Sequence, residues 1–406
     1  MSKLVIYLFG FSIPFYTFGI QLIDQIYISF PLLAFYIFTI FFILSGRFSQ
    51  KILFLIVLLN LYIFAITIIR VPLLEFIFAF SAFFISTLAL SINFERNPVL
   101  YCSFIKGFIS AAWITIVLIL LSFLTLLVLN ESQMYLLEPL GYKTNYGLGF
   151  FGFTRPTIFF IEPAHLSMYL VCVFVVTSFS VTNSYNNNVL NKLSFIAIMI
   201  TGSLAGAVIL VAFLITKKRR GFLKYLLTIF YTIILISIMY IFFQDSEIFS
   251  RLYRAFTTFS SHNYGGSEGQ RVGSIRVIYD TIKDGNIIIT LFGTGFSDYS
   301  TYLGNLYSDS ITGSAFRYGK ISNSIVVYFV SVGMTGFLLT IYVFGVIFGA
   351  NNIRLEHLLV ILLLMFVYGT FINYLLWVLI IALMKINTLT VSKYMNPLYD
   401  SQATNR

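Results

Sequence analysis

Long runs of apolar residues, separated by short polar connections, make up most of this sequence. A helix needs ~20 such residues to cross the hydrocarbon core of a bilayer. Eight segments meet this length with few charges, namely residues 4–23, 29–45, 52–69, 72–92, 107–129, 159–182, 221–243 and 323–348. The pattern therefore predicts a protein built from membrane-spanning helices.

Two further apolar stretches, 193–216 and 357–384, contain small and polar residues near their middle, "TGSLAG" and "GTFIN". The basic run "KKRR" (217–220) and the lysines of the tail favour the cytoplasm, but a single crossing by each stretch would place them outside. We expect two short helices or a re-entrant hairpin in each case, which returns the chain to the same side. For 193–216, one helix with its small residues at a packing seam is the alternative. The total is then about twelve passes.

Composition supports the same class of protein. Of the 406 residues, 59% are hydrophobic and only 10% are charged, whereas a soluble domain carries roughly a quarter charged residues. The net charge of +10 comes from short basic runs between apolar segments, such as "RFSQK" (47–51). That placement is typical of cytoplasmic loops and argues against nucleic acid as a partner. The spacing of the two cysteines and three histidines predicts no metal site, and no P-loop or other cofactor motif is present.

The hydrophobic pattern also divides the chain into regions. A polytopic all-α fold is expected with N-terminal spanning helices (1–129), a short external loop (130–158), central helices (159–243), a large external loop (244–322), C-terminal helices (323–384) and a cytoplasmic tail (385–406). Within the large loop, "SIRVIYDTIKD" (274–284) has the apolar period of an amphipathic helix. The run 286–296 is too short to span and is expected to dip onto the membrane face. Its "GTG" (293–295) lacks the context of a nucleotide-binding loop and is expected to be a turn.

Arginines are the first candidates for chemistry, because external loops are normally poor in them. The large loop holds seven basic and seven acidic residues, so individual arginines with individual tasks are expected. A guanidinium group holds phosphate oxygens with a flat, two-pronged fork, and Arg155, Arg271 and Arg276 together could bind a diphosphate. The alternative is that each arginine pairs with an acid: Arg155 with Glu162, Arg271 with Glu268, and Arg276 with Asp280.

A carboxylate and an imidazole begin the central helices in "RPTIFFIEPAHLSMYL" (155–170). Pro163 favours the first position of a helix, which places Glu162 at the helix start and His165 three residues later on the same face. The pair could serve as a general base that takes a proton from a sugar hydroxyl. Both residues also have a structural interpretation, with Glu162 as the carboxylate at a helix N-terminus.

Four stretches together resemble the O-antigen polymerase and ligase family, the Wzy-type integral membrane glycosyltransferases. They are the Arg-to-Glu-Pro element at 155–170, the small-residue segment "TGSLAGAVILVAFLI" (201–215), the arginine-led amphipathic helix and glycine turn at 270–296, and the helix "SNSIVVYFVSVGMTGFLL" (322–339) that follows the large loop. Each motif alone is weak, and their order and spacing carry the resemblance. The first 100 residues match only in hydropathy.

The resemblance implies a GT-C-like enzyme of the bacterial inner membrane that acts on the periplasmic face without a cofactor. Donor and acceptor would be oligosaccharides on undecaprenyl diphosphate, and a Wzz-type chain-length co-polymerase is an expected partner beside membrane lipids. The family's arginines fall on Arg155 and Arg271, with Arg276 as a second candidate. Glu162 and His165 are the nearest candidates for the base.

One departure bears on the choice within the family. Members of the ligase type that resemble this pattern carry a histidine where this chain has Ser322 and an acid where it has Ser331. That difference favours a repeat-unit polymerase. A glycan ligase and a lipid-linked sugar flippase are the alternatives.

Overall fold

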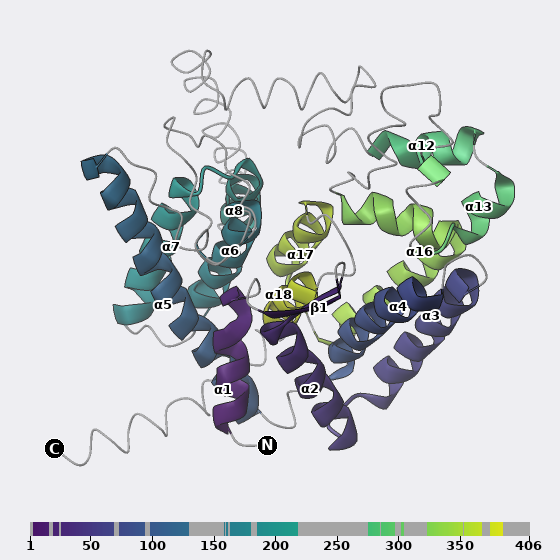
Figure 1. Cartoon of the computed structure of the whole chain (residues 1–406), viewed down its shortest axis with the longest axis horizontal. Coiled ribbons are helices and arrows are strands. Elements are labelled where there is room, and N and C mark those ends of the chain that lie inside the picture. The colour runs from purple at the N-terminus through teal and green to yellow at the C-terminus, as the bar shows by residue number, and fades with distance from the viewer. Residues whose placement is uncertain are drawn as a thin grey trace.

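Figure 1 shows the computed structural model of the chain, a predominantly helical molecule. The structure describes residues 3–15, 19–23, 26–68, 73–93, 98–129, 158, 160, 163–179, 185–217, 275–284, 286–296, 302–303, 323–351, 353–367 and 374–384. The helical class expected from the sequence is confirmed for these residues.

The N-terminal segment differs from the single spanning helix predicted over 4–23. Helix α1 (Lys3–Ser12) ends after ten residues, the 3-10 turn η1 (Ile13–Phe15) follows, and strand β1 (Gly19–Ile23) pairs antiparallel with β2 (Ile26–Ser29). Pro14 explains the early end of α1, because proline lacks the N–H group that a helix interior needs and its ring clashes with the preceding turn. The prediction of one helix over this segment was wrong.

Helices α2 (Phe30–Leu44), α3 (Gln50–Ile68), α4 (Leu73–Leu88) and α5 (Pro98–Leu129) follow, with the 3-10 turn η2 (Ala89–Ser91) after α4. The predicted hairpin of α3 and α4 is confirmed. Asn60 donates to the Thr87 hydroxyl at 3.0 Å between the two helices. An isolated antiparallel bridge between Phe48 and Ile92 closes the end of the hairpin where α3 begins.

The stretch 193–216 is broken, as its small residues predicted. Helix α7 (Tyr185–Ile200) and helix α8 (Leu204–Lys217) are separated by a turn in which Gly202 has a φ of 56°. Both pack on α6 (Pro163–Phe179). Asn191 near the start of α7 donates to Ser178, and Lys217 at the end of α8 donates to the Ser178 carbonyl. The two helices therefore form a hairpin that brings Lys217 back to the end of α6 from which α7 starts.

Helix α16 (Ser324–Ala350) contains a second break, at Gly333 (φ 67°, ψ −176°). The short helices α12 (Ile275–Asp284) and α13 (Ile287–Phe292) pack against it. A break in a helix releases backbone carbonyls that water cannot reach inside a membrane. All three carbonyls before Gly333 have donors: Thr294 N–H reaches Val330 O at 3.0 Å, Gly295 N–H reaches Ser331 O at 2.9 Å, and the Tyr62 hydroxyl reaches Val332 O at 2.9 Å.

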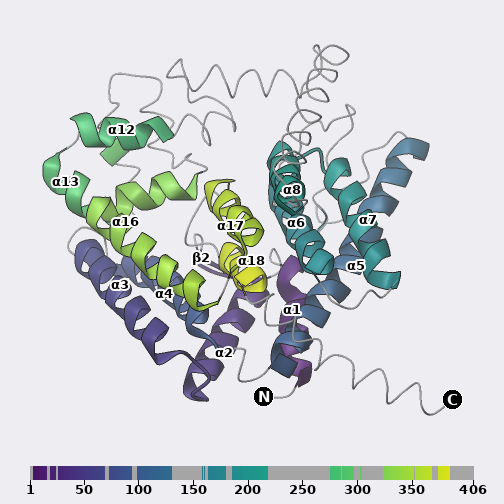
Figure 2. The same ribbon diagram turned by 180° about the vertical axis from the view of Figure 1, so that it is seen from behind.

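Helices α17 (Leu355–Val367) and α18 (Tyr374–Met384) complete the described chain and lie near the centre of the molecule (Figures 1 and 2). Within the stretch 357–384 the described residues belong to these two helices, and the "GTFIN" segment (369–373) lies outside the described residues. An aromatic cluster joins α18 to the rest of the core. Phe83 of α4 lies within 4.9 Å of Phe296, 6.0 Å of Tyr328 and 5.7 Å of Trp377, measured between ring centroids.

The outer surfaces of several helices are apolar. Leu61 on α3, Leu121 on α5 and Leu338 on α16 are each more than half exposed. Among the described residues, three helices are long and apolar enough to cross a membrane, namely Gln50–Ile68, Pro98–Leu124 and Ser324–Ala350. Exposed leucines on helices of this length are typical of lipid-facing surfaces, and these features indicate a membrane protein.

The crossing of α13 and α16 should tolerate no side chain at Gly333. A Cβ atom there would lie 2.6 Å from the carbonyl oxygen of Leu291, and the positive φ adds strain. We expect Gly333→Ala to lower the free energy of unfolding by ~2–5 kcal/mol, measured as thermal unfolding in detergent micelles. The matched control is Gly345→Ala in the same helix, where a Cβ meets nothing within 4 Å and stability should hold or rise. Equal effects of the two substitutions would contradict the crossing.

Candidate functional site

Helix α12 is strongly amphipathic and carries the one candidate arginine that the structure describes, Arg276. Val277 and Thr281, one turn apart, are buried. Val277 joins an apolar cluster with Leu303 and with the first half of α16, including Val326, Phe329 and Val330. This packing fixes α12 against the broken spanning helix and leaves the flanking face of α12 available for binding.

Arg276 lies on that flanking face with about a third of its side chain exposed. Its Nε atom is 3.8 Å from Oδ1 of Asp280, so the pairing suggested by their spacing is present but long for a hydrogen bond. The Nε atom is itself buried and makes no hydrogen bond. A guanidinium group held in this way retains donors for an anionic ligand.

Two hydroxyl groups at α12 are also buried, Oγ1 of Thr281 and Oη of Tyr302; they lie close to each other, but neither has a partner at good hydrogen-bond geometry. Burial raises the pKa of Tyr302, and a weak interaction with the Thr281 hydroxyl lowers it in part. Tyr302 therefore stays a neutral donor over the physiological pH range. Buried polar atoms without partners are rare in folded proteins and call for an explanation. A ligand that supplies the missing hydrogen bonds would be one.

The break in α16 adds a third buried hydroxyl, that of Ser331. This side chain is 1% exposed and its Oγ makes no hydrogen bond, while its carbonyl accepts from Gly295. Ser331 is the position at which an acid is expected in ligases that resemble this pattern. A serine at this position offers a hydroxyl donor and acceptor but no charge.

The other candidate region is the segment that leads into α6. Ile158 has a φ of 51°, in the left-handed region that a β-branched residue rarely adopts, and it is buried. Phe160 is also buried and packs on Tyr169, with 5.6 Å between ring centroids. The Tyr169 hydroxyl donates to the Phe108 carbonyl of α5 at 3.0 Å. Backbone strain that packing holds in place is common at functional sites, and this strain lies between the sequence positions of Arg155 and Glu162.

His165 stands in the first turn of α6 and is half-buried. Arg155, Glu162 and Arg271 lie outside the described residues. Neither the predicted binding of a diphosphate by the three arginines nor the predicted pairing of Glu162 with His165 as a general base is therefore tested. The structure does bring two of the sequence motifs together at this end of α6. A Cβ atom on Gly206 of α8 would lie 2.6 Å from the Ser167 side chain, so the start of α8 packs closely against the start of α6.

The two regions are separate in space. Helix α17 packs against α8 on one side and α16 on the other, and α18 packs against α6 and α4. In Figures 1 and 2, α17 and α18 stand between the α6–α8 group and the α12–α16 group. His165 and Arg276 therefore do not form one cluster among the described residues.

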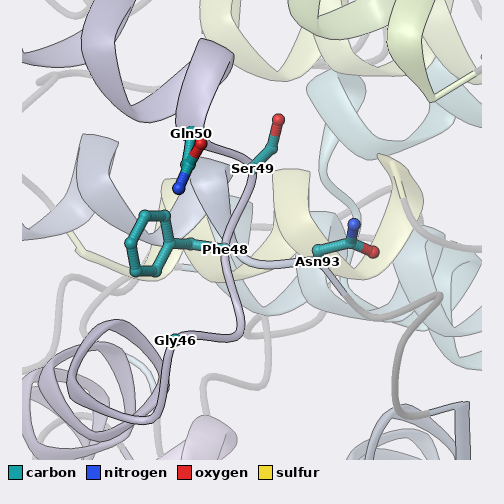
Figure 3. Close-up of a pocket in the computed structure, with 5 residues that line it drawn as sticks. All are labelled: Gly46, Phe48, Ser49, Gln50 and Asn93. Atoms are coloured by element: carbon teal, nitrogen blue, oxygen red, sulfur yellow. The ribbon is translucent and has the colours of Figure 1, made fainter.

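A cavity of about 330 Å³ lies at the end of the α3–α4 hairpin where α3 begins. Figure 3 shows its lining residues Gly46, Phe48, Ser49, Gln50 and Asn93. Two basic residues that are predicted to face the cytoplasm, Arg47 and Lys51, are adjacent in sequence to the lining residues Phe48 and Gln50. Tyr62, which contacts the break in α16, lies toward the other end of α3, so this cavity is distinct from the α12 site. No three potential metal ligands converge in the part of the chain that the structure describes.

Comparison with known proteins gives no assignment. No family model matches the sequence, and a search of curated proteins finds no significant match. Function is therefore argued from the residues and from their geometry.

The sequence did not reveal the break in α16 or the unpartnered hydroxyls. Gly333 and Gly336 lie in "SVGMTGF" (331–337), a signal of the same kind as "TGSLAG", but the apolar run around them predicts one uninterrupted helix. The "GTG" turn (293–295), expected only to be a turn, also supplies two of the donors for α16. Nothing in the sequence marks Thr281 or Tyr302, because their lack of partners depends on the packing of α12.

If Thr281 keeps a hydroxyl that no protein group satisfies, removing it should not destabilise the fold. We expect Thr281→Val to change the free energy of unfolding by less than ~0.5 kcal/mol or to raise it, because it removes a buried polar group without a partner. Thr340→Val is the matched control, since Thr340 bonds to the Tyr328 hydroxyl at 2.6 Å and to the Gly336 carbonyl at 2.7 Å, and it should cost ~1 kcal/mol. Chemical unfolding in detergent would compare the two variants. If Thr281→Val lowered the free energy of unfolding as much as Thr340→Val, the Thr281 hydroxyl would have a partner.

Proposed function

We propose that this protein is a polysaccharide repeat-unit polymerase of the inner membrane. It would transfer a glycan from undecaprenyl diphosphate to the non-reducing end of another lipid-linked repeat unit on the periplasmic face. The observation that carries this proposal is the position and hydrogen bonding of Arg276. This arginine lies on α12, which packs against the broken helix α16. Its Nε atom is buried and makes no hydrogen bond.

The chemistry requires charge stabilisation more than any cofactor. The acceptor hydroxyl oxygen attacks C1 of the donor sugar, and the bond from C1 to the diphosphate oxygen breaks with its electron pair on the leaving diphosphate. Arg276, together with Arg155 and Arg271, would neutralise the charge that grows on that group.

The proton of the acceptor hydroxyl passes to a base, for which Glu162 and His165 are the candidates. Attack from the face opposite the leaving group inverts the configuration at C1. The strained backbone at Ile158 supports a functional role for the segment before α6, because it holds that segment in an unusual conformation. His165 and Arg276 lie on opposite sides of α17 and α18, so this mechanism requires the base and the arginines to approach each other at one substrate.

Two alternatives predict different products. A glycan ligase would give one transfer per acceptor and no ladder of chain lengths. A flippase would move single repeats across the membrane without forming a glycosidic bond, and it would be expected to hold ionisable residues within its spans. Few such residues occur in the three long apolar helices of the described chain, which favours the enzyme.

The arginine assignment can be tested in proteoliposomes that contain lipid-linked repeat units. We expect Arg276→Gln to lower the rate of chain growth by ~10²–10³-fold, the usual effect of removing one donor to a developing negative charge. Arg276→Lys should recover only part of the rate, because lysine keeps the charge but loses the fork. Arg354→Gln, at an exposed arginine just before α17, is the matched control and should leave the ladder of products unchanged. Full activity of Arg276→Gln would remove this residue from the site.

The base can be identified by separate substitutions. Of Glu162→Gln and His165→Asn, the variant that removes the base should lose ~10²–10⁴-fold in rate, while the other should change the rate much less. Chain growth measured across pH 5 to 9 distinguishes a base from a residue that only supports the fold, since loss of the base also removes the fall in rate at low pH. If neither variant alters the pH profile, the base lies elsewhere.

A further inference from the structure

The outward faces of α12 and α13 are apolar, as suits a segment in which the run 286–296 is predicted to dip onto the membrane face. Tyr279 and Ile282 on α12 are 58% and 47% exposed, and Ile287 and Ile288 on α13 are 73% and 56% exposed. Leu291 and Phe292 extend the same surface along α13. Contiguous apolar side chains in such numbers mark a surface that contacts something other than water.

This surface is continuous with surfaces that have the character of lipid-facing helices. Helix α13 packs directly on α16, and α16 packs on α3. Beyond the break, Leu338 and Ile341 of α16 are 57% and 55% exposed, and Leu61 of α3 is 60% exposed. Both helices are long and apolar enough to cross a bilayer. The apolar face of α13 therefore lies next to helices whose exposed side chains have lipid-facing character.

The depth of α13 follows from its contact with α16. Val332, beside the crossing, accepts a hydrogen bond from Tyr62 of α3 at 2.9 Å. Tyr62 lies six residues before the end of α3 at Ile68, which is about 9 Å along a helix axis. Half of the hydrocarbon core is ~15 Å thick. With the end of α3 placed at the membrane surface, Gly293, which follows α13, lies at the depth of the acyl chains of one leaflet.

The charges of α12 fit the boundary of the same leaflet. Lys283, exposed in the last turn of α12, precedes α13, and Arg276 lies about two turns earlier. A lysine at this position can extend its ammonium group to lipid phosphates while its carbon chain stays among apolar groups. Figure 1 shows α12 and α13 next to one end of α3, on the same side of the molecule.

We propose that α12 and α13 form a lipid-binding surface immersed in the leaflet at this end of the bundle, with phospholipid acyl chains as its partner. The surface holds Arg276 at the level of the headgroups, where a lipid-linked diphosphate would lie. That second statement rests on the proposed function. The immersion itself does not, and it can be tested without any activity.

The test uses a fluorescent label on the full-length protein in nanodiscs. In a background with Cys102→Ala and Cys172→Ala, Ile288→Cys carries an environment-sensitive nitrobenzoxadiazole group. Phospholipids bearing a nitroxide on the acyl chain should quench the fluorescence of this label. The quenching should be at least ~half as strong as that of the same label at Leu338→Cys, because the side chains of Ile288 and Leu338 are similarly exposed, 56% and 57%. Aqueous iodide should quench neither. A label at Lys283→Cys should respond more to a headgroup nitroxide than to one deep in the chain.

Three outcomes would overturn the proposal. Strong quenching at position 288 by iodide would place α13 in water. Insensitivity to both quenchers would mean that protein covers the surface, either a second copy or another segment of this chain. Loss of lipid quenching on addition of undecaprenyl phosphate would identify a polyprenyl chain as the occupant. Lipid quenching in a protein that makes no polymer would uphold the surface and reject the proposed function.

Discussion

The arrangement of α12 and α13 depends on the need to satisfy every backbone carbonyl at the break in α16. At Gly333 the helix releases the carbonyls of residues 330 to 332, and inside a membrane no water replaces the lost donors. The glycine turn after α13 supplies two donors and Tyr62 of α3 supplies the third. One hydrogen-bonding requirement thus connects a spanning helix, its neighbour and the segment that carries Arg276. The close backbone approach needs glycine at both 293 and 333.

The same constraint gives the candidate site its rigidity. Arg276 is on a short helix that would not be stable alone, and its position derives from the buried contacts of Val277 with Leu303 and α16. Because those contacts use the first half of α16, the orientation of that half relative to the second half sets the position of the arginine. The unpartnered hydroxyls of Thr281 and Tyr302 are fixed by the same packing. A site built in this way presents its donors before a ligand arrives, which lowers the cost of ordering them on binding.

Much of the helical organisation could be predicted from hydropathy, and the failures have specific causes. The turn between α7 and α8 was predictable because "TGSLAG" breaks the apolar run and the following "KKRR" disfavours a single crossing. The early end of α1 was missed although Pro14 was visible, because the apolar pattern continues past it into β1. The break at Gly333 lies among valines and phenylalanines, which suit an unbroken helix equally well. Whether the helix breaks there therefore depends on the tertiary contact with residues 293–295, which the local sequence does not show. For the site, Arg276 and its helix were predictable from residue type and apolar period, whereas burial without a partner is a property of packing that no spacing encodes.

The small hairpin of β1 and β2 has a consequence of its own. A sheet of two strands leaves a row of unpaired amide and carbonyl groups along each outer edge, and hydrocarbon cannot accommodate them. The edge groups must therefore pair with water or with polar groups of the protein. Helix α1 has ten residues, or about 15 Å, which is about half of the ~30 Å hydrocarbon core. If the hairpin lies in the membrane and water reaches its edges, the membrane potential would fall over a shorter distance beside α1.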